Sequence, residues 1–105
     1  MDNKKVSNAF QVFLHEAKEH SAAWMEAVQK LDAASSLDKK TEELAYLAVM
    51  AAVGLESGIP FHVKSAKEHG ATREDVKSAI LLGLPAVGNK VIQGLPIALD
   101  AFDKE

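Results

Sequence analysis

The chain has 105 residues, with 12 Lys and Arg against 15 Asp and Glu, so its formal net charge is −3. Apolar residues make up 48% of it, aromatic residues only 6%, and cysteine is absent. The acidic balance disfavours nucleic acid and anionic membrane surfaces as partners, and the lack of thiols excludes disulfides, thiol catalysis and thiolate metal sites. At this length we expect one domain over residues 1–105, with a core of small aliphatic side chains.

The N-terminal residues lack the continuous apolar segment of a signal peptide, and the longest apolar run covers residues 44–53. That run is far shorter than the roughly 20 residues that a membrane-spanning helix needs. We therefore expect a soluble, cytoplasmic protein. Because an alanine-rich chain with few aromatic residues builds a modest core, we also expect it to bury further surface as a homo-oligomer.

Apolar residues recur at three- and four-residue spacing from the beginning of the chain. This pattern predicts an amphipathic helix with one buried face. The residues of that face are Val6, Phe10, Phe13, Leu14 and Ala17. Ser21 is suited to cap a second helix, because its hydroxyl can accept a bond from a backbone N–H. The predicted inner stripe of the second helix is Trp24, Met25, Val28 and Leu31.

A third helix is predicted to begin at Asp38, whose carboxylate is a good N-cap. Acidic residues follow in its first turns, where the helix dipole favours them. From residue 44 to residue 53 this helix is apolar on every side, so we expect it to be buried on every side and central to the fold. Gly54 weakens it, and Gly58 with Pro60 marks the turn and the start of the next helix.

The remaining predicted helices are marked by glycine, proline and capping residues. A fourth helix covers about residues 59–69 and ends at Gly70, which suits a left-handed C-cap. Thr72 caps a fifth helix, with Asp75 in a capping-box-like position. A last helix follows two interruptions, at Pro85 and Gly88, and is predicted to be kinked by Gly94 and Pro96. No segment alternates with a period of two, so the predicted fold class is all-α.

Four features in the middle of the chain occur together in a fixed order. They are the helix start LDKKTEEL at residues 37–44, an alanine-rich helix, the turn from Gly54 to His62, and the step HGATRED at residues 69–75. In this order and spacing they resemble the carboxymuconolactone decarboxylase and alkyl hydroperoxidase D-like superfamily. The resemblance implies a compact six-helix subunit with a helix-turn-helix core, assembled as a trimer or a hexamer.

The resemblance also indicates which positions carry chemistry in related proteins. The peroxidase branch has a Cys-x-x-Cys pair before the histidine, and the corresponding positions here are Leu55 and Gly58, so thiol peroxidase activity is excluded. The acidic position of that branch falls on Glu43, and Ser57 stands where some members have another histidine. The decarboxylase branch lacks the cysteine pair and keeps the histidine, here His62, but commonly lacks the acid. The sequence therefore matches neither branch completely.

His62 and Glu43 are the candidate catalytic residues. His62 lies beside a glycine turn, where it could transfer a proton or could pack at the helix start with a hydrogen bond to a neighbour. Glu43 could orient or deprotonate it, or could be an early-helix acid favoured by the dipole. Because Glu43 lies about 16 Å below Gly54 at about 1.5 Å per residue, a straight helical hairpin keeps the two side chains apart. Their contact is predicted to need a break in the helix or a neighbouring subunit.

Three further residues are candidates for ligand binding. Tyr46 places a hydroxyl in the apolar helix, where it can line a pocket or join the core or an interface. Glu56 and Ser57 offer a carboxylate and a hydroxyl in the turn, and a solvated turn is the alternative. No cofactor is predicted. No metal site is predicted either, because the two histidines near residue 17 are five residues apart and lie on different helix faces, although each has an acid four residues away. Those residues are His15, Glu16, Glu19 and His20.

Two functions remain open at this point. In the first, the chain is an oligomeric helical protein without thiol peroxidase activity, with at most a small-ligand pocket near His62. In the second, it is an acid/base enzyme of the decarboxylase type, in which His62 transfers a proton of a small carboxylated molecule and Glu43 orients His62. A cavity bordered by both side chains favours the enzyme, and a solid core there favours the non-catalytic protein.

Overall fold

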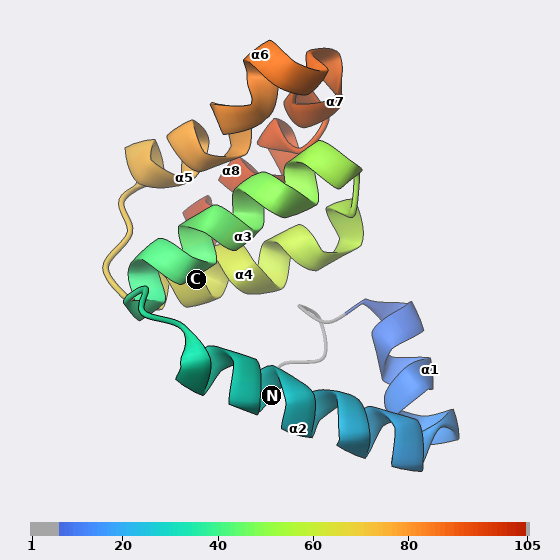
Figure 1. The fold of residues 1–105 in the computed structure, drawn as a ribbon. Helices are drawn as coiled ribbons and strands as arrows, with labels where there is room; N and C mark the ends of the chain where they lie inside the picture. The colour runs from blue at the N-terminus through green and yellow to red at the C-terminus, as the bar shows by residue number, and fades with distance from the viewer. Residues whose placement is uncertain (1–6, 105) are drawn as a thin grey trace. The chain divides into compact units, whose positions relative to one another are not determined.

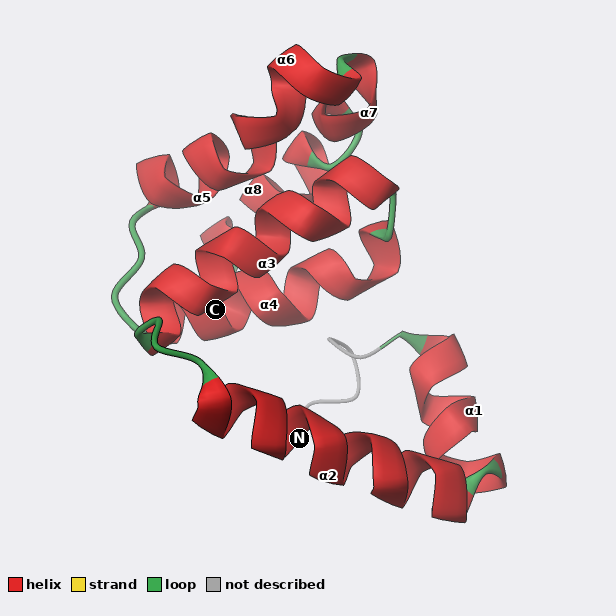
Figure 2. Cartoon of the chain, viewed as in Figure 1, coloured by secondary structure: helices red, strands yellow, loops and turns green. Residues whose placement is uncertain are grey.

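The structure, a computed structural model, describes residues 7–104. All regular structure in this range is helical, which confirms the all-α prediction (Figure 2). Six of the helices have eight residues or more, in agreement with the expected six-helix subunit. The α-helices are α1 (Asn8–Glu16), α2 (Lys18–Ala34), α3 (Lys39–Val53), α4 (Ile59–Glu68), α5 (Arg73–Ile80), α6 (Leu84–Val87), α7 (Asn89–Ile92) and α8 (Leu95–Asp103). Two 3-10 turns, η2 (Glu56–Gly58) and η3 (Leu81–Gly83), lie between them.

The chain folds as two compact units, Met1–Leu37 and Asp38–Glu105. The first unit contains α1 and α2, and the second, here called the core unit, contains α3 to α8 (Figure 1). No helix within residues 7–104 combines the length and the apolar character that crossing a membrane requires.

In the first unit the two helices follow each other almost without a break. Ala17 has φ −126° and ψ 62°, which ends α1, and α2 begins at the next residue. The prediction that Ser21 caps the second helix is therefore wrong: its hydroxyl lies inside α2 and donates to the Lys18 carbonyl at 3.0 Å. Val6, which was assigned to the first helix, lies outside the described residues.

The stripe of α2 that was predicted to face inward is exposed. Trp24 is 59% exposed and Leu31 is 70% exposed, and Ser21 is the buried residue of α2. The apolar spacing identified the helix correctly, but it did not show whether the chain itself covers that face.

The core unit is built around α3. The Asp38 carboxylate accepts a bond from the Thr41 N–H at 2.8 Å, which confirms the predicted cap. α3 packs against α4, α5, α7 and η3, and α3 and α4 run side by side after a sharp turn (Figure 1). The fully buried larger side chains of the core are Leu47, Met50, Ile59, Val63, Val76, Ile80 and Val91.

One face of α3 is not covered, so the prediction that this helix is buried on every side is wrong. Tyr46, Val49 and Val53 are 45%, 54% and 64% exposed, respectively. Their spacing of three and four residues places them on one side of the helix, and we call this set the α3 stripe. The buried residues of α3, which include Leu47 and Met50, lie on its other faces, and Tyr46 stands at the border of the stripe, where it also contacts α4.

Most of the glycine and capping residues that predicted the other helix ends have the predicted role in the structure. Gly70 has φ +97°, the left-handed conformation expected after α4, and the Thr72–Asp75 capping box is formed at the start of α5. The last helix is not one kinked helix: α7 ends before Gly94, and α8 begins with Pro96 in its first turn. A side chain at Gly94 would lie 3.0 Å from Ile59, so glycine allows this close approach.

Candidate functional site

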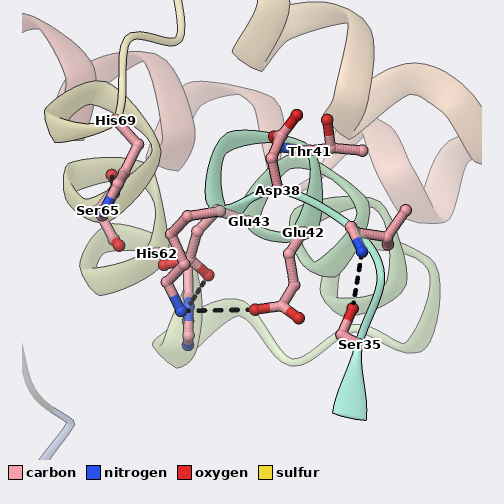
Figure 3. Close-up of polar contacts among 10 residues, drawn as sticks. Ser35, Asp38, Thr41, Glu42, Glu43, His62, Ser65 and His69 are labelled. Carbon is pink, nitrogen blue, oxygen red and sulfur yellow. Dashed lines mark hydrogen bonds and ion pairs between the residues drawn. The ribbon is translucent and has the colours of Figure 1, made fainter. Parts of the chain in front are cut away.

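The candidate site lies where α3 passes α4. His62 Nδ1 and Glu43 Oε1 are 3.0 Å apart, within hydrogen-bonding distance. The Glu43 side chain is only 6% exposed and the His62 side chain is 24% exposed. Figure 3 shows the two side chains reaching toward each other from neighbouring helices. The acid therefore lies behind the imidazole, and the imidazole is the part of the pair that solvent reaches.

The contact forms within one chain, so the prediction from a straight helical hairpin is wrong. The reason is the path between α3 and α4. A side chain at Gly58 would lie 3.0 Å from Met50 Sδ, so Gly58 is already level with Met50 rather than with the end of α3. From that level Glu43 lies about 10 Å down α3 and His62 about 6 Å down α4, at about 1.5 Å per residue. The two long side chains span the remaining difference.

The protonation of the pair follows from the environment of Glu43. Burial raises the pKa of Glu43, but hydrogen bonding with His62 and with the Ser65 hydroxyl outweighs burial and holds the pKa below its ordinary value of 4.5. Glu43 is therefore ionised at neutral pH and can only accept hydrogen bonds. Neutral His62 must then carry its proton on Nδ1, which leaves the lone pair of Nε2 available.

Two aromatic rings contact the imidazole. The rings of Tyr46 and His62 are 4.6 Å apart at an interplanar angle of 88°, and those of Phe61 and His62 are 5.2 Å apart at 78°. Tyr46 comes from α3, one turn after Glu43, and Phe61 precedes His62 in α4. Both rings are partly exposed, at 45% and 38%. The site is thus an imidazole with a buried carboxylate on one edge and aromatic rings beside it.

The family model for carboxymuconolactone decarboxylases matches residues 18–100. The chain belongs to the carboxymuconolactone decarboxylase family. No curated protein and no protein of solved structure matched it. The matched range includes Glu43 and His62 and extends across both compact units. Family membership confirms the resemblance seen in the sequence.

Two of the candidate ligand-binding residues, Glu56 and Ser57, are not part of the Glu43–His62 pair. Glu56 and Ser57 lie in η2, where Glu56 is half-buried and Ser57 is exposed. Neither side chain forms a hydrogen bond with Glu43 or His62 in the described structure. Of the three proposed ligand-binding residues, Tyr46 alone contacts His62.

Sequence reasoning missed Phe61 and Ser65. Ser65 follows His62 by three residues in α4, so its side chain projects from the same side of the helix. The spacing of three residues could have placed Ser65 beside His62. It could not have placed Ser65 near Glu43 without knowing that α3 lies on that side of α4. As for metals, residues 7–104 contain no group of three or more His, Asp or Glu side chains placed to hold an ion.

Because of the hydrogen bond between Glu43 and His62, the protein is expected to lose stability at acidic pH. A carboxyl whose pKa is lowered by folding contributes stability above its unfolded pKa, near 4.5, and loses that contribution as the pH falls through the lower folded value. We expect Glu43→Gln to lower the free energy of unfolding by about 1–3 kcal/mol at neutral pH, because a buried charged hydrogen bond is replaced by a neutral one. Below pH 4.5 the difference from the unaltered protein should shrink.

Urea unfolding at a series of pH values between neutral and strongly acidic measures this difference. Glu68→Gln is the matched control, because it makes the same change at an exposed position of α4 and should leave stability nearly unchanged. A stability loss for Glu43→Gln that persists undiminished into acid would show that the ionised carboxylate is not its source.

Proposed function

We propose that this protein is an acid/base catalyst that acts on a small carboxylated molecule. The observation that carries the proposal is the bond between His62 Nδ1 and the buried Glu43 carboxylate. Such a bond fixes the imidazole in one tautomer and stabilises the imidazolium that forms when Nε2 takes a proton. A histidine that served only to pack at a helix start would not require a buried, ionised partner.

The reaction that fits is decarboxylation of a carboxylated lactone with proton transfer to carbon. The bond between the carboxylate and the ring carbon breaks, carbon dioxide leaves, and the conjugated lactone carbonyl takes up the electron pair. The imidazolium of His62 then donates the Nε2 proton to carbon, while Glu43 keeps the bond to Nδ1–H. Neutral His62 regains its proton from water. The step balances without an oxidant or a reductant.

The dithiol chemistry of the peroxidase branch is not part of this proposal, because the chain has no cysteine. Leu55 and Gly58 stand at the two positions concerned: Leu55 precedes η2 and Gly58 is its last residue. Neither side chain can form a thiolate.

The proposal is tested by incubating the protein with a series of carboxylated lactones in heavy water. We expect release of carbon dioxide from at least one lactone, and one deuterium bound to a ring carbon of the product. Gas detection and mass spectrometry measure the two products. If no lactone loses carbon dioxide faster than in buffer, the decarboxylase proposal is wrong.

A second candidate is a non-catalytic protein that assembles with copies of itself and holds a small ligand near His62. The α3 stripe favours it, because Val49 and Val53 are apolar and more than half exposed in the second half of α3. Contiguous apolar surface of this kind marks interaction sites in soluble proteins. A trimer or hexamer of this chain is the assembly that the family resemblance led us to expect.

Self-association is expected to depend on the α3 stripe. We expect the unaltered protein to sediment well above the 11.3 kDa of one chain, and Val49→Asp to shift it toward that mass, because a charge in an apolar contact must be desolvated. Sedimentation velocity measures both. Ser78→Asp, an exposed change on α5, is the control that should leave the assembly intact. An unaltered protein that sediments as one chain would remove this candidate.

A further inference from the structure

The hydrogen bond to Glu43 restrains one atom of the His62 ring and leaves the ring plane free. Rotation about the last side-chain torsion of histidine has broad minima, so one bond at Nδ1 permits a range of ring orientations. Proton transfer to or from a bound molecule depends on the direction in which Nε2 points. A second contact is therefore needed if Nε2 is to hold one direction.

Tyr46 supplies that second contact. Its ring lies 4.6 Å from the imidazole, near the short end of the range for aromatic pairs, and the two planes are almost perpendicular at 88°. Because Tyr46 follows Glu43 by three residues, both side chains project from the same side of α3 toward α4. Helix α3 thus restrains the imidazole twice: Glu43 holds the Nδ1 atom, and Tyr46 holds the plane of the ring.

Phe61 does not have the same effect. Its ring also meets the imidazole, at 5.2 Å, but it is the residue next to His62 in α4. It moves with the backbone that carries His62, so it cannot fix the imidazole relative to Glu43. The contact across the two helices comes from Tyr46.

The ring of Tyr46, rather than its hydroxyl, makes the contact. The hydroxyl forms no hydrogen bond with any residue between 7 and 104, and 45% of the residue is exposed. We infer that Tyr46 is a positioning residue whose ring fixes the plane of the His62 imidazole and so the direction of Nε2. The kinetic consequence of this inference depends on the proposed function, and its spectroscopic consequence does not.

The test compares Tyr46→Leu, which removes the ring, with Tyr46→Phe, which removes only the hydroxyl. We expect Tyr46→Leu to lower kcat for the carboxylated lactone about tenfold with KM within about twofold, because a misdirected base loses rate more than binding. We expect Tyr46→Phe, which keeps the ring, to retain a kcat within about threefold of that of the unaltered protein. Phe102→Leu makes the same loss of a ring in α8, away from His62, and should have little effect on kcat.

The spectroscopic measurement is the mobility of the His62 ring, read from NMR relaxation of the carbon nuclei in the imidazole. The chain has four histidines, and His62→Ala identifies the signals that belong to His62. We expect the ring to hold one orientation in the unaltered protein and in Tyr46→Phe, and to turn over a wider range in Tyr46→Leu, where the bond to Glu43 alone restrains it.

Two results would overturn the inference. If Tyr46→Phe changes kcat and the mobility of the His62 ring as much as Tyr46→Leu does, the hydroxyl is the active group. If Tyr46→Leu behaves like Phe102→Leu in both measurements, the ring does not position His62. Absence of turnover in the unaltered protein would defeat the proposed function instead, and the measurement of ring mobility would still decide the role of Tyr46.

Discussion

Replacement of His62 by alanine is expected to lower the turnover of a carboxylated lactone by about 10²- to 10⁴-fold, the range that general acid–base catalysis provides. The imidazole is the exposed member of the pair, and Nε2 is its nitrogen without a bond to Glu43. Without it, the carbon must take its proton from water. KM should change much less than kcat, because the proton is transferred in the reaction and not in binding. Steady-state kinetics with each variant measures the two constants.

His69→Ala is the matched control for this prediction. His69 also belongs to α4, as its C-cap, but its Nδ1 lies 2.8 Å from the Ser65 carbonyl oxygen and it does not contact Glu43. The control should keep kcat within about twofold of the unaltered protein. If His62→Ala proves poorly folded by circular dichroism, His62→Gln keeps a polar side chain at the same position. Full turnover in a folded His62 variant would show that another group handles the proton.

Replacement of Leu47 by alanine is expected to lower the free energy of unfolding by about 2–5 kcal/mol, the usual range for a buried leucine. Leu47 is fully buried on the inner side of α3, within the cluster that contains Val63 and Ile80. The lost side chain leaves a cavity that rigid helices can fill only in part. Because small domains are stable by about 5–15 kcal/mol in total, this change removes a large share of the stability.

Leu82→Ala is the control for the core substitution. It makes the same chemical change in η3, where Leu82 is 71% exposed. Exposed substitutions of this kind usually change stability by about 0.5 kcal/mol or less. Urea unfolding of the two variants under one set of conditions compares them directly. Equal losses would mean that α3 does not form the centre of the core.

The parts of the fold that could be predicted from sequence are those set by local chemistry. Asp38 and Thr72 accept bonds from N–H groups only three residues away, and Gly70 adopts its positive φ within its own backbone. Such features need no knowledge of distant residues. Burial is different, because it depends on what covers a face. The α3 stripe and the exposed face of α2 have the apolar character of a core without being covered in the described chain.

The two residues of the Glu43–His62 contact were named from the sequence, but the contact itself was not predicted. Glu43 and His62 were identified from chemistry and from the family resemblance, but their separation was judged from two straight helices. The error came from the connection, where Gly58 packs against Met50 and returns the chain before α4 begins. Spacing of three residues could have suggested Ser65 once His62 was chosen, because both project from one side of α4.

The contact between Gly58 and Met50 also limits which residues position 58 can accept. The Met50 sulfur lies 3.0 Å from where a Cβ on residue 58 would stand. Any residue larger than glycine at this position would therefore require the flexible Met50 side chain to shift by a few tenths of an ångström. Because Met50 is part of the buried core, the turn before α4 and the centre of the core have to adjust to each other when either residue is replaced.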